Sequence, residues 1–215
     1  MGLKLQIKSE QVTSRILRIY DLTGTYNATS NPSGWGVNND DPNPDVNDVV
    51  DVADVPGVLF MLETNGATYT YQDTTNIKAA GFPNATNQKI DLLASDFGLD
   101  KFPDGYYKIT AKVAGNYTYF DGSEYVTQGF SSQVTIEDFF YAQAECCVRT
   151  FAKAVSAASS TDCFCDNEDV KKFVHADTLL EAIHNLAADQ KWTDATNTLT
   201  NLQTYCTAGG GNCGC

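Results

Sequence analysis

The sequence lacks long apolar runs. No stretch of about 18 apolar residues occurs in the 215-residue chain, and a helix needs about that many to cross a bilayer. The first eight residues alternate polar and apolar side chains, without the apolar segment of a secretory signal peptide. We therefore expect no membrane partner and no export by that route, so that the protein works in the compartment where it is made.

Basic residues are also scarce. Lysine and arginine total 14 against 27 acidic residues, which gives a formal net charge of −13. Proteins that grip nucleic acid neutralise phosphates with lysine and arginine. The charge therefore argues against a protein that binds DNA or RNA specifically. Apolar residues still make up 42% of the chain, which is enough to form a folded core.

The motifs of common catalytic sites are missing. The chain has no phosphate-binding Gly-Lys loop, no His-Glu-x-x-His pair and no Gly-x-Ser-x-Gly turn. Its two histidines, His175 and His184, are nine positions apart on one predicted helix. Since each residue turns a helix by about 100°, they lie on opposite faces and cannot share one site. The sequence predicts no enzyme, no cofactor and no metal centre.

Cysteine is absent before residue 146, and all seven cysteines lie in the last 70 residues. An odd number cannot pair completely within one chain, and without a secretion signal we expect mostly reduced thiols. The Cys-x2-Cys pair typical of zinc sites does not occur. In the interpretation we favour, Cys147 and Cys206 are small core residues and the other thiols are accessible to solvent. A zinc site, and disulfides formed after release from the cell, stay open as alternatives.

Residues 1–137 are predicted to form β structure, because apolar side chains recur there with a period of two. The candidate strands cover residues 3–8, 12–20, 58–62, 68–71, 89–93, 106–113 and 126–136. The pair Asn65-Gly66 is typical of a tight hairpin turn. Many short strands with turn residues between them predict an antiparallel immunoglobulin-like β-sandwich.

Alternation also assigns the faces of the two longest strands. In the segment 106–113, the buried face is expected to carry Tyr107, Ile109, Ala111 and Val113, and the exposed face Lys108, Thr110 and Lys112. In the segment 126–136, one face carries Val126, Gln128, Phe130, Ser132, Val134 and Ile136.

Residues 138–215 are predicted to form a cysteine-containing domain of three helices, so that the fold class is α+β. Apolar residues recur there at helical spacing. The three stripes are Phe140, Ala144, Cys147, Val148, Phe151 and Val155; then Phe173, Ala176, Leu180, Ile183 and Ala187; then Trp192, Ala195, Leu199, Leu202 and Cys206. Asp166 or Asn167 is expected to cap the second helix. The short connection at 188–191 makes the second and third helices antiparallel neighbours.

A long arm at residues 21–54 interrupts the β half. It is rich in Asn, Asp, Pro, Gly and Ser, and loops of this length inside a domain are often functional. Asp41-x-Asn43-x-Asp45 matches the start of a calcium-binding loop, but the glycine required at the sixth position and the glutamate at the twelfth are missing. A solvated loop is the interpretation we favour over a calcium site.

The arm carries motifs that point to a family. They are Asp21-Leu22-Thr23-Gly24-Thr25-Tyr26, Asn31-Pro32-Ser33-Gly34-Trp35-Gly36 and Pro42-Asn43-Pro44-Asp45-Val46. This pattern resembles that of the small neck or tail ring proteins, the head-to-tail connector virion proteins, of crAss-like and other Bacteroidetes tailed phages. Asp104-Gly105-Tyr106-Tyr107 and the paired Cys146-Cys147 match later parts of the same pattern. The sequence departs from it at residues 37–41, which are extra.

The resemblance implies a non-enzymatic structural protein of the virion. Such a subunit belongs to a homo-oligomeric ring of about twelve copies, in the neck or tail barrel that joins the capsid portal to the tail. It touches other neck, portal or tail ring proteins, and DNA passes through the ring without being bound specifically. Assembly takes place in the cytoplasm of the bacterial host. The expected inter-subunit contacts are Tyr26, Gly34, Trp35, Gly36 and Asn43.

Two other functions remain open from the residues alone. A carbohydrate-binding or adhesion sandwich would stack sugars on exposed aromatic side chains, with Tyr69, Tyr71, Tyr117 and Tyr119 as candidates. A metal- or redox-active host protein would use the C-terminal cysteines.

Overall fold

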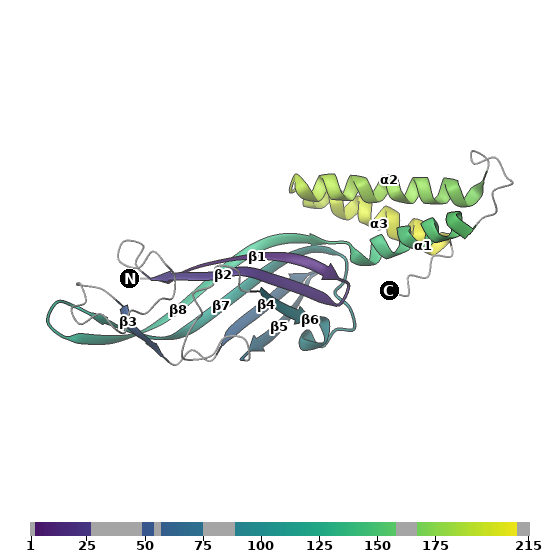
Figure 1. The fold of residues 1–215 in the computed structure, drawn as a ribbon. Helices are drawn as coiled ribbons and strands as arrows, with labels where there is room; N and C mark the ends of the chain where they lie inside the picture. The colour runs from purple at the N-terminus through teal and green to yellow at the C-terminus, as the bar shows by residue number, and fades with distance from the viewer. Residues whose placement is uncertain (1–2, 27–48, 54–56, 75–88, 158–166, 210–215) are drawn as a thin grey trace. The chain divides into compact units, whose positions relative to one another are not determined.

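The computed structural model describes residues 3–26, 49–53, 57–74, 89–157 and 167–209. Within these ranges the chain has an α+β fold with eight strands, three α-helices and one short 3₁₀ helix (Figure 1). It divides into two compact units. The first comprises Met1–Val12, Ile16–Asp100 and Lys108–Glu137, and the second comprises Thr13–Arg15, Lys101–Tyr107 and Asp138–Cys215.

A three-stranded sheet holds β1 (Leu3–Thr13), β2 (Ile16–Tyr26) and β6 (Lys89–Leu93), in the order β1-β2-β6. Strand β2 pairs antiparallel with β6, from Ile16 opposite Leu93 to Tyr20 opposite Lys89. The buried side chains on these strands are Leu5, Ile7, Leu17, Ile19, Ile90 and Leu92. They follow the predicted alternation, so the period of two identified the buried face of this sheet correctly.

The predicted strand at residues 12–20 is wrong at its start. The chain turns between β1 and β2, where the backbone N–H of Arg15 donates a hydrogen bond to Thr13 Oγ1 at 3.1 Å. A hydroxyl that bonds the backbone two residues on offers the chain a turn in place of a strand ladder. On the exposed face of β2, Arg18 forms a bidentate pair with Asp91 at 2.7 and 2.9 Å. This hydrogen-bonded guanidinium holds the pKa of Asp91 below its usual range.

A five-stranded sheet contains β3 (Val49–Ala53), β4 (Val58–Thr64), β5 (Ala67–Asp73), β7 (Gly105–Phe120) and β8 (Tyr125–Phe140). Strands β4 and β5 form the hairpin predicted from Asn65-Gly66, with Thr64 opposite Ala67. The backbone φ angles are 49° at Asn65 and 75° at Gly66. Positive φ at both central residues is the mark of the turn that matches the twist of two antiparallel strands.

Strands β7 and β8, each longer than the strand predicted there, pair with each other as a hairpin (Figure 1). One edge of β7 pairs first with β4, where Leu62 lies opposite Ile109, and further along with β3, where Ala53 lies opposite Asn116. Strand β8 takes the other edge. Cross-strand hydroxyl bonds join the hairpin at both ends, between Thr110 and Thr135 at 2.8 Å and between Thr118 and Thr127 at 2.9 Å.

The faces of β7 are largely as predicted. Tyr107, Ile109, Ala111 and Val113 are buried, and Lys108 and Lys112 are exposed. Thr110, expected on the exposed face, is only 7% exposed. Its hydroxyl bonds that of Thr135 on β8, and a buried hydroxyl needs such a partner. Thr110 thus lies on the same face as Lys108 and Lys112, as predicted, but its predicted exposure is wrong because the contact with β8 was not anticipated.

The helical part contains α1 (Ala142–Ala157), α2 (Glu168–Ala188) and α3 (Trp192–Ala208). Asn167 caps α2 as predicted, since its side chain accepts the backbone N–H of Asp169 at 2.8 Å. Phe140, expected in the first helical stripe, is the last residue of β8. None of the described helices is long and apolar enough to cross a membrane.

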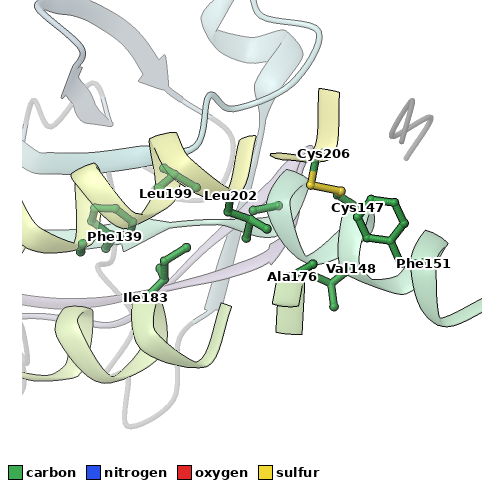
Figure 2. Packing of buried hydrophobic residues seen from close by; sticks show 11 residues of the cluster. Phe139, Cys147, Val148, Phe151, Ala176, Ile183, Leu199, Leu202 and Cys206 are labelled. Carbon is green, nitrogen blue, oxygen red and sulfur yellow. A yellow bond between two sulfur atoms is a disulfide. The ribbon is translucent and has the colours of Figure 1, made fainter. Parts of the chain in front are cut away.

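The core of the second unit is one cluster of buried side chains. It consists of Phe139, Ala144, Cys147, Val148, Phe151, Ala176, Ile183, Ala195, Leu199, Leu202 and Cys206 (Figure 2). Members from all three helices follow the predicted stripes, so the spacing of 3.6 residues identified the packed faces. Trp192 packs beside this cluster, stacked on Phe139 with an interplanar angle of 3°.

Candidate functional site

The arm residues predicted as inter-subunit contacts lie mostly outside the described part of the chain. Gly34, Trp35, Gly36 and Asn43 are all in the undescribed range 27–48. Tyr26 is the last residue of β2, and its side chain is not described. The calcium-loop candidate at residues 41–52 also falls largely outside the described ranges. These interpretations remain predictions from the sequence.

Two outer strands of the five-stranded sheet, β5 and β8, have an unusual composition. Within the described residues, β8 pairs only with β7 and β5 pairs only with β4. Residues 125–136 of β8 and 67–72 of β5 contain no charged residue and no proline. Outer strands commonly carry lysine, proline or a bulge that prevents further pairing. Neither charge nor proline blocks these two.

The three-stranded sheet of the same unit shows the usual pattern. Its outer strand β1 carries exposed Lys8 and Glu10, and its outer strand β6 carries exposed Lys89 and Asp91. Charged side chains on an edge oppose the approach of another strand. The outer strands of the three-stranded sheet therefore carry exposed charges, whereas in the five-stranded sheet residues 67–72 of β5 and 125–136 of β8 carry none. The short strand β3, which pairs with β7 beyond β4, carries Asp51.

The far end of the β7–β8 hairpin is aromatic with an acidic tip. Tyr117 lies between Tyr119 at 5.7 Å and Phe130 at 6.2 Å, measured between ring centroids. Its hydroxyl donates to Gln128 Oε1 at 3.0 Å, and the residue is 3% exposed. Tyr117 therefore cannot stack on a sugar, and its assignment to an exposed carbohydrate platform is wrong. Tyr125, which was not among those candidates, is 60% exposed.

Asp121 organises the turn at the tip of the same hairpin. Its carboxylate oxygen Oδ1 accepts the backbone N–H groups of Ser123 and Glu124, each at 2.8 Å. These bonds to backbone N–H groups hold the pKa of Asp121 below its usual range. The tip is thus a defined turn whose carboxylate is ionised at neutral pH, and it separates the two long strands of the hairpin.

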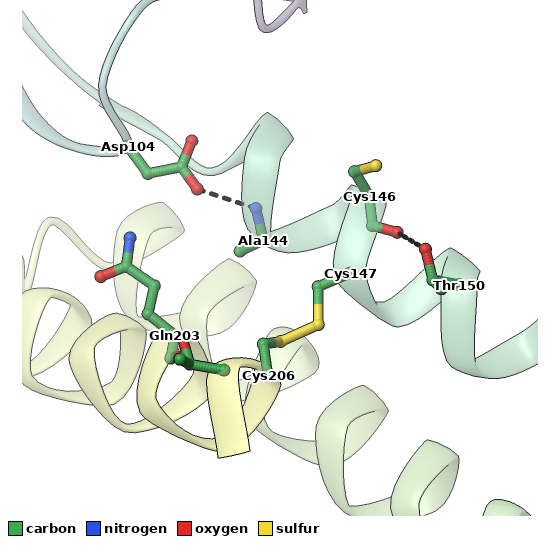
Figure 3. The surroundings of a disulfide bond; sticks show 8 residues. Asp104, Ala144, Cys146, Cys147, Thr150, Gln203 and Cys206 are labelled. Carbon is green, nitrogen blue, oxygen red and sulfur yellow. Dashed lines mark hydrogen bonds between the residues drawn. A yellow bond between two sulfur atoms is a disulfide. The ribbon is translucent and has the colours of Figure 1, made fainter. Parts of the chain in front are cut away.

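The cysteines correct the expectation of reduced thiols. Cys147 on α1 and Cys206 on α3 are both buried, as predicted, but they form a disulfide across 59 positions of sequence (Figure 3). Cys146 is disulfide-bonded as well. No group of three or more potential metal ligands occurs among the described residues. The Cys147–Cys206 disulfide is buried in the helical core and joins α1 to α3. Such a bond acts as a structural clamp, because it holds the two helices together covalently.

The two histidines lie apart, as their spacing predicted. Both histidines lie on α2. The ring centroid of His184 is 4.6 Å from that of Tyr141, and the ring centroid of His175 is 4.5 Å from that of Tyr205. His184 Nε2 also lies 3.6 Å from a carboxylate oxygen of Glu145. Each imidazole thus packs on a different tyrosine from a different helical face, and the pair shares no site.

A surface groove of about 350 Å³ lies between α1 and α2. Val148, Phe173 and Leu180 line it together with Glu145, Arg149 and Asp177. Arg149 lies 3.9 Å from Glu145 one helical turn earlier, so its charge already faces a carboxylate. Side chains of both charges therefore surround apolar side chains in this groove. Its lining contains no pair of a nucleophile and a base that could act together in catalysis.

Asp104 is the most perturbed carboxyl among the described residues. Its two oxygens accept the backbone N–H groups of Gln143 at 3.1 Å and Ala144 at 2.8 Å, in the first turn of α1 (Figure 3). The residue is 7% exposed. Burial raises the pKa of the carboxyl, the two backbone bonds lower it, and nearby Glu145 raises it again, which leaves the pKa at about 6.

This role of Asp104 was not predicted, because a cap 40 positions away from Ala144 has no local spacing to reveal it. A capping residue is normally found immediately before the helix. The uncharged edge of β8 could have been found, because its composition is visible in the sequence once a strand is assigned there.

No protein-family model, curated protein or solved structure matches this chain.

Proposed function

We propose that the chain is a non-enzymatic structural protein of the virion of a tailed phage. In this proposal it is a ring subunit of the neck or tail barrel, which joins the capsid portal to the tail and helps to form the DNA conduit. The observation that carries the proposal is that two outer strands of the five-stranded sheet, β5 and β8, have long segments without charge or proline, residues 67–72 and 125–136. An outer strand without charge or proline is a surface on which a further strand can pair.

The charge of the chain supports a conduit. With 27 acidic against 14 basic residues, a ring of many copies repels the phosphate backbone, so that DNA slides through without being held. The buried disulfide supports a particle that leaves the cell, because virions meet oxidising surroundings after release. We place the protein in the neck or tail of the virion, after assembly in the cytoplasm of a bacterial host.

The finer fold assignment is an immunoglobulin-like sandwich. Each sheet has one buried face, and Tyr71 on β5 packs edge-on against Phe97, which follows β6, at 5.7 Å. The hydroxyl of Tyr107 donates to the carbonyl oxygen of Pro103 at 2.7 Å. A tyrosine near the start of a strand that bonds the backbone a few residues earlier is a recurrent feature of immunoglobulin-like domains.

Imaging tests the proposal directly. The purified chain is examined by electron microscopy and by native mass spectrometry across a range of concentrations. We expect closed rings of one stoichiometry. A chain that stays monomeric at every concentration, or that binds ligands on a glycan array, would contradict the ring function and favour the adhesion alternative.

A further inference from the structure

The direction of the strands makes the two uncharged edges complementary. Where β4 pairs with β7, the order across the five-stranded sheet runs β8, β7, β4, β5, and β3 pairs with β7 further along. Strand β7 pairs antiparallel with β4, and β4 pairs antiparallel with β5. The β7–β8 hairpin is closed by the Asp121–Glu124 backbone bond at 3.1 Å. Each step reverses direction, so β5 and β8 run opposite to each other.

We propose that copies of this chain join through these strands, with the outer edge of β5 in one copy pairing antiparallel with the outer edge of β8 in the next. This inference rests on the ring function proposed above and names its junction. A second copy displaced along the sheet without being turned over brings its β8 beside β5 of the first. The alternation of strand directions then continues unbroken from copy to copy.

The lengths of the two strands are compatible with such a junction. Strand β5 has seven residues, and at about 3.3 Å per residue it spans about 23 Å. Strand β8 has 16 residues, so it is long enough to pair with all of β5. The uncharged parts, residues 67–72 and 125–136, are the parts that would lie in contact.

Side chains on the outward face of the sheet are also compatible. Thr70 lies opposite Met61, and Met61 lies opposite Thr110, whose hydroxyl bonds Thr135. This row crosses the sheet from one edge to the other and has a threonine at each end. Threonine pairs already join β7 to β8, and cross-strand pairs of this kind stabilise neighbouring strands.

The junction is heterologous, because one edge meets a different edge of the next copy. Such contacts close into a ring when the rotation between copies allows it. A dimer made from two β8 edges would be isologous instead, and it would leave β5 unused. The two arrangements therefore predict different responses to changes on β5.

Charge substitutions at both edges test the junction. Gln133 on β8 and Thr70 on β5 are both exposed and lie on the outward face. We expect Gln133→Lys with Thr70→Lys in one chain to abolish ring formation, and each single change to raise the dissociation constant by about tenfold or more. Gln133→Lys with Thr70→Glu should assemble better than Gln133→Lys alone, since the opposite charges would lie on the same face of the sheet and within two residues of each other across the junction.

The matched control is Gln6→Lys, the same type of change on an exposed residue of β1 in the other sheet. It should assemble like the unmodified chain. Circular dichroism confirms that every variant folds, and sedimentation velocity measures assembly. Rings that survive the double-lysine change overturn this inference but leave the ring function standing. Loss of assembly by Gln133→Lys with no response to either Thr70 change also overturns it, in favour of a β8–β8 dimer. An unmodified chain that forms no ring overturns the ring function itself.

Discussion

Replacement of Asp104 by asparagine tests how the helical unit depends on pH. The carboxyl is 7% exposed, and its pKa is raised from 3.8 to about 6. The folded protein therefore holds a proton on Asp104 between about pH 4 and pH 6, where the unfolded chain has released it. Stability from this group is fully present below pH 4 and is lost as the pH rises through 6. This is opposite to the behaviour of a carboxylate in an ion pair.

The size of the effect follows from the same shift. A rise from 3.8 to about 6 is about two pKa units, and each unit corresponds to ~1.4 kcal/mol. The unfolding free energy should therefore fall by about 3 kcal/mol from pH 4 to pH 7 through Asp104 alone. Asparagine does not titrate and retains an oxygen that can accept the N–H of Ala144. The difference in stability between the Asp104→Asn variant and the parent should change by that amount over this range.

Urea unfolding provides the assay. The chain has two tryptophans, so in a Trp35→Phe background Trp192 alone reports on the helical unit. Parent and Asp104→Asn chains are compared at pH 4, 5, 6 and 7, and carbon NMR of the Asp104 carboxyl gives its pKa directly. A stability difference that stays constant within about 1 kcal/mol from pH 4 to pH 7 would refute the reasoning. It would mean that the two backbone bonds at the start of α1 outweigh burial and keep the carboxylate ionised.

Three further predictions concern the disulfide, a glycine and the arm. Changing both Cys147 and Cys206 to alanine opens a loop of 59 positions and should cost about 4 kcal/mol of unfolding free energy; a loss under about 1 kcal/mol in urea unfolding would contradict a structural clamp. Gly57→Ala should prevent correct formation of the β4–β5 hairpin, because φ is +132° and the added Cβ would overlap the carbonyl oxygen of Asp73; an unchanged circular dichroism melt would count against this. Trp35→Ala should weaken ring assembly by about 2–4 kcal/mol per contact without unfolding the monomer, and unfolding of the monomer instead would place Trp35 in the core of its own chain.

The elements that the sequence predicted well have a local physical cause. Asn65-Gly66 specifies a turn by its own backbone preferences, so the β4–β5 hairpin needs no distant partner. Asn167 caps α2 from the position immediately before it. The three helical stripes follow from a repeat of 3.6 residues, which does not depend on where the helix packs.

The elements that were missed depend on contacts far apart in the sequence. The predicted strand ended at residue 113, where the alternation of apolar residues stops, but pairing with β3 and β8 extends β7 to Phe120. Phe140 belongs to a strand and α1 begins two residues later, with its first N–H groups bonded to the distant Asp104. The thiols were expected to be reduced because of the inferred compartment. Whether Cys147 and Cys206 are close in space depends on how α1 packs against α3, 59 positions apart in the sequence.

The contrast between the two sheets connects the charge of the chain with its proposed assembly. A net charge of −13 makes copies of the chain repel one another, and ionic screening acts over only about 8 Å at physiological salt. A junction that carried acidic side chains would add close repulsion and the cost of taking charges out of water. Uncharged segments on the outer strands avoid both the repulsion and the desolvation cost, because backbone groups and threonine hydroxyls exchange bonds with water for bonds with the next copy.

The exposed Lys8, Glu10, Lys89 and Asp91 on the other sheet oppose pairing there. Thus the charge pattern both permits association through β5 and β8 and disfavours it through β1 and β6.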